Sequence, residues 1–391
     1  MRTEGGDVRR HVILRGAFPR TTNAKAVAVE KRMLAALEAI HTRLNGVAAD
    51  EFRKALMDDD IIERFLNGES DFWDARERTV EARARNFSEA REKAIIAALS
   101  HLKNEDASAI RRAIGKGDLY GVVDADGMYD RVARIHAEAP WMAPATTAVM
   151  RAMRAYFGEP GWSDGRRELR LPPMILLGKP GVGKSAWARS LGRAFGVPSI
   201  EVDVGAAKGG AFSLVGPERG WGGSSPGRLV SHMLGNGVAN PVVVVDEIDN
   251  APGRISTSRG GFVPGIHETL KSLMEPVSAR SWTCPYYQVQ LDMSRVNWIM
   301  TANTISEEMS ASFLDRVQIV HIPDPTPPQI ISAGLAMLNG RVRDSDDLAA
   351  AKNVLEVRIS EEVARGRRVS LRDVRRMAEG LVSAISAPMM N

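Results

Sequence analysis

The spacing of apolar residues along the chain changes twice. Before residue 122 the apolar positions recur at helical spacing, as in Met33 and Leu37. From 122 to 325, short runs of branched apolar residues alternate with longer segments of helical pattern, which is typical of an α/β domain. From 326 to 391 only helical patterns return. The pattern therefore predicts an α/β domain between two helical regions.

We expect these regions to be separate parts of the molecule. They are a basic arm over 1–22, a helical N-terminal domain over 23–121, the α/β domain over 122–325 and a small helical lid domain over 326–391. Five strands are expected in the α/β domain: Met174–Leu177, Ser199–Val202, Val242–Val245, Val296–Thr301 and Val317–Ile322. The segments between them are long enough for right-handed helical crossovers, which join parallel strands. The predicted fold class is α/β with a five-stranded parallel sheet.

Composition narrows the class of protein. The chain has 391 residues, of which 44% are hydrophobic and 26% charged, so it can bury more than one core. No apolar run approaches the roughly 18 residues of a membrane span, and the N-terminus lacks the apolar core of a signal peptide, so we expect a cytoplasmic protein without membrane contact. Cys284 is the only cysteine, which excludes an intrachain disulfide and a thiolate metal cluster. A net charge of +4 permits contact with nucleic acid but does not predict it.

A glycine-rich segment follows the first expected strand and precedes a helical pattern. In Gly178–Ser185 the glycines let the backbone curl so that successive N–H groups point at phosphate oxygens. Lys184 would reach the β and γ phosphates, and the Ser185 hydroxyl would ligate Mg²⁺. The alternative, a chance match in a glycine-rich turn, is disfavoured by the strand before it and the helix after it. We expect this loop to bind ATP through Gly178, Pro180, Gly181, Val182, Gly183, Lys184, Ser185 and Ala186.

A second motif supplies carboxylates. The four valines Val242–Val245 suit a central parallel strand covered on both faces, and Asp246 and Glu247 follow directly. Ligands of parallel sheets bind at the carboxyl ends of the strands, so these acids should meet the phosphates. Asp246 would bind the nucleotide-associated Mg²⁺ together with Ser185, and Glu247 would polarise the attacking water. The two motifs together predict hydrolysis of ATP.

The two motifs and the segments after them resemble an AAA+ ATPase, specifically the ATPase module of the Lon type. The resemblance covers roughly residues 165 to 376. Arg219–Gly227 resembles the pore loop, and Leu270–Pro276 with Tyr286–Leu291 resembles the helix and hairpin beyond the acidic strand. Val296–Asn303 resembles the sensor-1 strand. Phe313–Arg316 resembles the arginine-finger segment, and Ser370–Val374 resembles the sensor-2 segment. The resemblance implies a P-loop AAA+ fold with an all-helical C-terminal lid.

The resemblance also implies three further catalytic residues. Asn303, at the end of a strand, would orient the attacking water beside Glu247 and sense the γ-phosphate. Arg316 would reach the nucleotide of a neighbouring subunit, and Arg372 would contact the same phosphates from its own subunit. Taken singly, each would be a surface or capping residue, and their joint placement favours the catalytic interpretation. An arginine acting in trans requires a ring, which we expect to be homohexameric.

Trp221 is a large aromatic residue among glycines. In the Lon-like interpretation its loop, with Gly222, lines a central channel in which aromatic rings grip an extended polypeptide. Gly222 stands where Lon-type loops usually have an aliphatic residue, which weakens that grip. The alternative is a loop whose tryptophan packs back onto the domain surface. A second pore element is expected over Ala251–Phe262, where Arg254 and Arg259 could equally attract nucleic acid phosphates.

The sequence leaves three functions open. The first is a ring ATPase that remodels or translocates a protein substrate, with a protein adaptor as a further partner and without a peptidase of its own, because the sequence stops at Asn391, soon after the lid. The second is an AAA+ motor or switch that acts on nucleic acid. The third is a nucleotide-gated scaffold. Trp221 favours the first function, whereas Arg254, Arg259 and the basic arm keep the second open.

Overall fold

The computed structural model describes residues 10–11, 78, 81–82, 85–86, 89–90, 92–113, 117–159, 165–204, 211–220, 224–256 and 262–386. The chain divides into two compact units, residues 14–115 and residues 1–13 with 116–391. Helical patterns predicted around 33–44 and 52–65 lie outside the described residues, as does the basic arm apart from Arg10 and His11. The predicted domain boundaries remain predictions.

The described part of the smaller unit is helical. Helical residues occur between 78 and 98, and helix α5 follows at Asn104–Ala113. This helix has acidic residues in its first turn and basic residues in its last, which complements the helix dipole. Among the apolar side chains of this part, Leu99 is buried, with 2% exposure, and Ile96 is 47% exposed.

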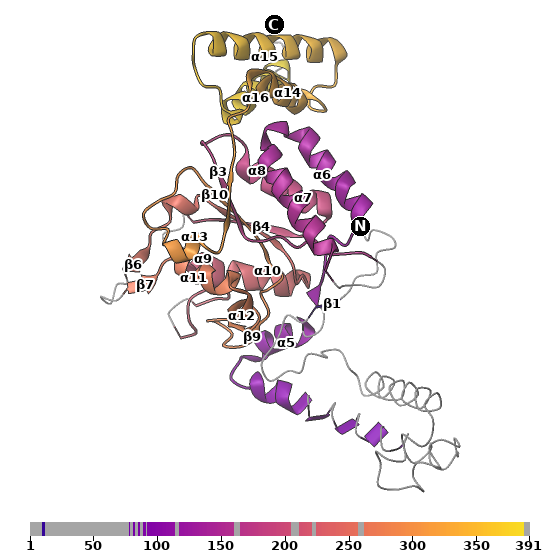
Figure 1. The fold of residues 1–391 in the computed structure, drawn as a ribbon, viewed down its shortest axis with the longest axis vertical. Coiled ribbons are helices and arrows are strands. Elements are labelled where there is room, and N and C mark those ends of the chain that lie inside the picture. The colour runs from indigo at the N-terminus through magenta and orange to yellow at the C-terminus, as the bar shows by residue number, and fades with distance from the viewer. Residues whose placement is uncertain are drawn as a thin grey trace. The chain divides into compact units, whose positions relative to one another are not determined.

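The larger unit is built on the predicted parallel sheet (Figure 1). Its strands are β3 Met174–Leu177, β4 Ser199–Asp203, β5 Val242–Asp246, β10 Asn297–Ala302 and β11 Gln318–His321. Their order is β11-β3-β10-β5-β4, and every neighbouring pair is parallel. Because β10 lies between β3 and β5, the strand ends that carry Gly178, Asn303 and Asp246 share one edge of the sheet. The predicted five-stranded parallel sheet is confirmed.

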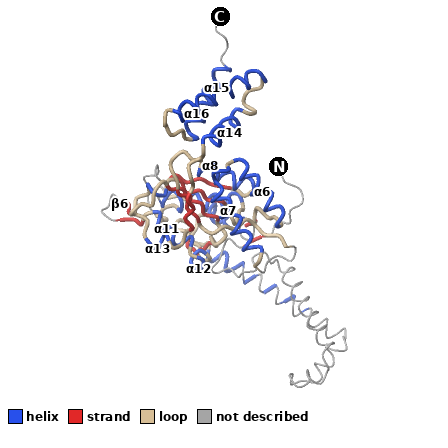
Figure 2. The backbone as a smooth tube through the Cα atoms, turned by 45° about the horizontal axis from the view of Figure 1, so that its top comes forward, coloured by secondary structure: helices blue, strands red, loops and turns tan. Residues whose placement is uncertain are grey.

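Helices cover both faces of this sheet; Figure 2 draws the strands in red and the helices around them in blue. On one face lie α6 Ala125–Glu138, α7 Ala143–Phe157 and α8 Lys184–Phe195, with the short 3-10 helix η1 Pro140–Met142. On the other face lie α9 Ala211–Val215, α10 Arg228–Asn236, α11 Ile266–Met274 and α12 Pro276–Ala279. The valines of β5 are fully buried, as expected for a strand covered on both sides.

Short elements complete this unit. They are β1 Arg10–His11 paired with β2 Gly117–Asp118, η2 Ile248–Asn250, β6 Arg254–Ser256 paired with β7 Phe262–Pro264, β8 Trp282–Thr283 paired with β9 Gln290–Leu291, and α13 Ala311–Leu314. Strand β6 and the first residue of β7 lie within the expected second pore element, Ala251–Phe262. Strand β9 lies within the predicted hairpin segment Tyr286–Leu291, and its partner β8 precedes that segment. Arg10 of the expected basic arm belongs to strand β1 and pairs with Asp118 of β2.

Three helices form the C-terminal part. They are α14 Pro327–Leu338, α15 Ser345–Ala364 and α16 Leu371–Ser386. Thr326 and Gln329 form a capping box at the start of α14, and the Asp344 carboxylate caps α15. The three helices bury a core of their own. At Gly334 an added Cβ would come within 2.7 Å of the Val374 side chain, so only glycine allows α14 and α16 to pack this closely.

Candidate active site

The glycine-rich loop has the backbone conformation that its sequence predicts. It joins the end of β3 to the start of α8, and Gly181 and Gly183 have φ angles of +78° and +95°, a region that favours glycine. An added Cβ on Gly181 would lie 2.7 Å from Ser370, so this position excludes side chains sterically as well. The buried Trp141 indole donates to the Val182 carbonyl at 2.9 Å and fixes the loop from the α7 side. The first turn of α8 begins with Lys184, Ser185 and Ala186, so its free N–H groups face the loop.

Lys184 lies inside the loop and is 7% exposed. Its Nζ donates to the carbonyls of Gly178 and Lys179 at 2.5 and 3.1 Å and to Asn303 Oδ1 at 3.0 Å. Burial lowers the pKa of the amine, while Asp249 and Asp246 act in the opposite direction. The structure thus brings the predicted phosphate-binding lysine and the predicted sensor asparagine into direct contact.

Asp246 connects three elements through one oxygen. The hydroxyls of Ser185 and Thr301 both donate to Asp246 Oδ1, the former at 2.7 Å. The Thr301 hydroxyl in turn accepts from the Glu247 N–H at 3.1 Å. Ser185 and Asp246 therefore present neighbouring oxygen atoms, the ligand type that Mg²⁺ prefers. Thr301 was not predicted as a site residue, although its place two residues before Asn303 on the same strand could have indicated it.

Glu247 turns the chain sharply at the end of β5. Its φ and ψ are +56° and 44°, a left-handed conformation that costs a non-glycine residue on the order of 1–2 kcal/mol. Asn250 stabilises the turn, because its N–H donates to the Glu247 carbonyl at 2.9 Å and its side-chain amide to Glu247 Oε2 at 3.1 Å. Asp249 accepts from the N–H groups of Asn303 and Thr304 at 2.9 and 3.2 Å and so anchors the end of β10. This anchoring role of Asp249 was not predicted.

The other predicted residues have separate positions. Arg316 follows α13, is exposed, and donates to the carbonyl of Ser312, so it lies apart from the cluster around Asp246. Arg372 lies in the first turn of α16, with its Cβ 3.9 Å from the position of an added Cβ on Gly181. Its exposed side chain therefore starts beside the glycine-rich loop. Trp221 and Gly222 lie outside the described residues.

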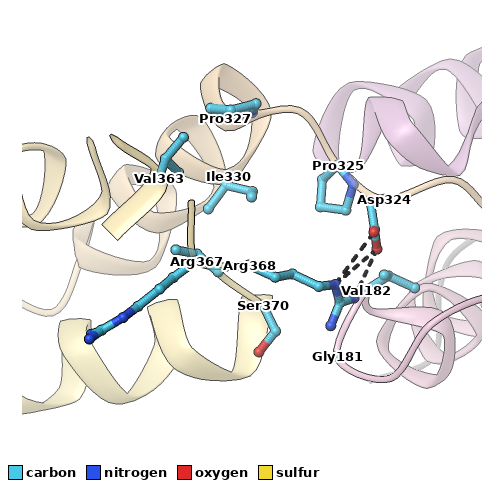
Figure 3. Close-up of a pocket in the computed structure, with 11 residues that line it drawn as sticks. Gly181, Val182, Asp324, Pro325, Pro327, Ile330, Val363, Arg367, Arg368 and Ser370 are labelled. Atoms are coloured by element: carbon cyan, nitrogen blue, oxygen red, sulfur yellow. Dashed lines mark hydrogen bonds and ion pairs between the residues drawn. The ribbon is translucent and has the colours of Figure 1, made fainter. Parts of the chain in front are cut away.

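The helical C-terminal part also contacts the glycine-rich loop. The Leu371 N–H donates to the Gly181 carbonyl at 2.9 Å. Arg368 donates to the Pro180 carbonyl at 3.0 Å and to Asp324 Oδ1 at 2.8 Å, and Lys179 donates to Asp324 Oδ2 at 2.7 Å. Figure 3 shows Arg368 reaching Asp324 beside the loop. The sequence pattern gave no sign of this contact.

Arg368 and Lys179 both act on the pKa of the Asp324 carboxyl. The hydrogen bond from Arg368 is the largest cause of the lowered pKa of this carboxyl; burial raises this pKa, and the hydrogen bond from Lys179 lowers it further. The contact is therefore present above the ordinary carboxyl pKa and is lost only as the pH falls through the lowered value. Beside it lies a cavity of about 160 Å³, lined by Gly181, Val182, Asp324, Pro325, Pro327, Ile330, Val363, Arg367, Arg368, Val369 and Ser370.

Comparison with known proteins agrees with this geometry. Residues 174–323 match the family described as ATPase family associated with various cellular activities (AAA). The peroxisomal Lon protease homolog 2 of Spinacia oleracea is 31% identical over 183 residues, which are 47% of this chain and 20% of that protein. The Lon protease of Halothermothrix orenii is 30% identical over 177 residues, which are 45% of this chain and 22% of that protein. A solved structure titled "Closed State CryoEM Reconstruction of Hsp104:ATPyS and FITC casein" has a TM-score of 0.47 and 18% identity, covering 65% of this chain and 46% of its own.

The fold and the family match define an AAA domain on the P-loop sheet. More particularly, the similarity to Lon proteases, at about 30% identity over somewhat less than half of this chain, is consistent with a Lon-like AAA+ module. The chain spans about a fifth of the length of the Lon relatives it matches.

The contact between Arg368 and the loop can be tested with a neighbouring control. Arg368→Gln should speed hydrogen exchange at the amides of residues 179 and 181–183 about three- to tenfold, since a partly exposed charged hydrogen bond contributes on the order of 1 kcal/mol. Arg367→Gln should leave these amides unchanged, because Arg367 pairs with Glu362 within the C-terminal helices and points away from Arg368 (Figure 3). Exchange measured by mass spectrometry that responds equally to both changes would contradict the assignment.

Proposed function

We propose that this module binds ATP with Mg²⁺ and hydrolyses it. The observation that carries the proposal is the meeting of Lys184, Ser185, Asp246, Glu247 and Asn303 at one edge of the sheet. The oxygens of Ser185 and Asp246, 2.7 Å apart, fit a magnesium ion. Such an ion, when bound, would neutralise charge on the phosphates during transfer. The match to the AAA family supports the same activity.

Each residue of the cluster has a proposed role. Lys184 would exchange its carbonyl acceptors for the β and γ phosphates, because its ammonium group is already enclosed by the loop. Glu247 would accept a proton from the attacking water, and Asn303 would orient that water. Contact between Lys184 and Asn303 gives the sensor side chain direct access to the phosphate-binding lysine. The cavity beside Gly181 and Val182 would receive part of the nucleotide distant from the γ-phosphate.

The two proposed arginines act from different subunits. Arg372 starts beside Gly181 in its own subunit and would contact the phosphates in cis. Arg316 is exposed and bonded to its own helix, so it is available to a neighbouring molecule. We place it at the nucleotide of the next subunit, where a guanidinium would stabilise transition-state charge. This arrangement requires a ring of subunits, and we propose that the ring is a homohexamer.

The substrate that we propose is a polypeptide, moved or remodelled through the centre of that ring. The proposal is supported by Trp221 among glycines and by similarity to proteins named Lon proteases. The β6–β7 pair frames the second expected pore element, in which Arg254 and Arg259 keep nucleic acid as the alternative substrate. A nucleotide-gated scaffold is the third option. In that case neither unfolded protein nor nucleic acid would stimulate the hydrolysis of ATP.

A cytoplasmic location is also a proposal. Among the described helices, none has the length and apolar character needed to cross a bilayer. The chain contains a single cysteine, as is usual in a reducing compartment.

Binding and hydrolysis should separate in two variants. Lys184→Ala should abolish detectable binding of a fluorescent ATP analogue, because it removes the charged partner of the phosphates. Glu247→Gln should bind the analogue within about threefold of wild type but release phosphate about 10²- to 10⁴-fold more slowly, because the base is lost. Lys179→Ala, a neighbouring lysine whose side chain bonds to Asp324, should bind within about threefold. An equal loss of binding in the Lys184 and Glu247 variants would be inconsistent with these roles.

The substrate can be tested by stimulation of phosphate release. Unfolded casein should raise the ATPase rate at least about twofold, Trp221→Ala should remove the stimulation while sparing the basal rate, and Trp221→Phe should retain most of it because an aromatic ring remains. DNA should have no comparable effect. Stimulation by DNA alone, unaffected by Trp221→Ala, would replace the polypeptide proposal with the nucleic acid alternative.

A further inference from the structure

Helix α11 lies between the turn that carries Glu247 and the helix that precedes Arg316. Two polar residues of α11, His267 and Lys271, are four positions apart and therefore lie on one face of the helix. His267 contacts both neighbouring elements, and Lys271 contacts the second. The mechanism proposed above gives neither residue a role. The two residues lie between Glu247 and Arg316, which in the proposed mechanism act in the active sites of different subunits.

His267 restrains the Glu247 turn from the protein interior. Its Nε2 lies 3.0 Å from the Ile248 carbonyl, which can only accept, so Nε2 carries the proton. Ile248 directly follows Glu247, whose left-handed backbone persists only when surrounding contacts hold it. The Glu247 N–H donates to the Thr301 hydroxyl and the Asn250 N–H donates to the Glu247 carbonyl, and the His267 bond is a further restraint on this turn.

The same imidazole ring packs against the element that leads to Arg316. The ring centroids of His267 and Phe313 are 5.1 Å apart at an angle of 74°, an edge-to-face contact. Both side chains are buried, with 2% and 0% exposure. The Arg316 N–H donates to the Phe313 carbonyl at 3.1 Å, so the backbone of the proposed finger is fixed to Phe313. Lys271 strengthens this side, because its Nζ donates to the Ser312 hydroxyl at 3.1 Å.

The chemistry of the position argues against a purely space-filling role. Nδ1 of His267 is buried and has no hydrogen-bond partner within the described part of the chain. An orphaned acceptor destabilises the folded state, and burial lowers the pKa of His267, which disfavours a second proton there. A phenylalanine would pack against Phe313 without an orphaned atom. What histidine adds is the N–H donor to Ile248, so the donor and the ring serve two different neighbours.

We propose that His267 is a positioning residue that couples the two halves of the catalytic apparatus within one subunit. Its N–H donor positions Glu247, which acts in the subunit's own active site. Its ring positions Arg316, which the subunit offers to the next active site. A shift of the Glu247 turn would move the Ile248 carbonyl and be transmitted through the packed ring to Phe313. The inference rests on the proposed hydrolysis of ATP with a finger in trans.

Two substitutions separate the two contacts. His267→Phe keeps a ring against Phe313 but lacks the donor, and His267→Gln keeps a donor in reach of Ile248 but lacks the ring. Each should lower kcat at least about tenfold with the KM for ATP within about twofold, because ground-state binding is untouched. His232→Phe and His232→Gln are the matched controls. His232 is a half-buried histidine on α10 that contacts Asn236, and its variants should keep kcat within about twofold.

Mixed rings then show which active site each variant impairs. His267→Phe has a defective Glu247 turn and an intact finger, so mixing it with Arg316→Ala should restore hydrolysis, whereas mixing it with Glu247→Gln should not. His267→Gln has the opposite defect, so Glu247→Gln should restore it and Arg316→Ala should not. A mixture of Glu247→Gln with Arg316→Ala is the reference for complementation. Thermal melting followed by circular dichroism verifies that each variant is folded.

The possible outcomes distinguish this inference from the proposed function. Three outcomes would overturn the coupling role alone. The first is a wild-type kcat in either His267 variant, and the second is restoration of both variants by the same partner. The third is restoration of neither variant although the reference mixture is active. An inactive reference mixture beside an active wild type would show that the finger does not act in trans. An inactive wild type would remove the proposed hydrolysis. In these last two cases the coupling inference falls together with the function on which it rests.

Discussion

The candidate site depends on the position of β10 between β3 and β5. Parallel pairing on both sides brings three strand ends to one edge, where each contributes a different chemical group: backbone N–H groups and a lysine, an amide, and carboxylates. A single oxygen of Asp246 then accepts from Ser185 at the start of α8 and from Thr301 on β10. This shared acceptor fixes the separation between the phosphate loop and the acidic strand, so displacement of one element strains the others. A different strand order would leave the same residues without a common site.

The second constraint is the close approach between the glycine-rich loop and the C-terminal helices. Gly181 has no room for a side chain beside Ser370, and its carbonyl accepts from the N–H of Leu371 at the start of α16. A change in the conformation of the loop must therefore be accommodated by α16, which carries Arg372. Charged contacts between Asp324, Lys179 and Arg368 strengthen the same junction, and because they are partly exposed they can be exchanged at moderate cost. Under the proposed hydrolysis of ATP, the junction would connect the phosphate-binding loop to movement of the C-terminal helices.

Much of the fold was predictable because its signals are local. The four valines before Asp246 favoured a buried strand, and the glycines between strand and helix allowed the curled backbone that the structure has at Gly181 and Gly183. The approach of these two motifs followed from the rule that ligands bind at the carboxyl ends of parallel strands.

The contacts that were missed join residues far apart in the chain and depend on the path of the backbone between them. Asp249 anchors the N–H of Asn303, and Arg368 reaches Asp324 and Pro180, yet no spacing in the sequence indicates either pair. His267 carries no motif either, and its position between Ile248 and Phe313 emerges only when α11 is packed against both.

The central claim is that ATP is hydrolysed at a site completed by a neighbouring subunit. The most direct measurement is the rate of phosphate release per molecule, followed over a wide range of protein concentration with and without Mg²⁺, while light scattering reports the assembly state. The account predicts a Mg²⁺-dependent rate per molecule that rises with concentration in step with ring formation, because a lone molecule lacks the neighbour's Arg316. A rate per molecule that stays constant while the protein changes from monomer to oligomer, or an absence of hydrolysis in the assembled state, would contradict it.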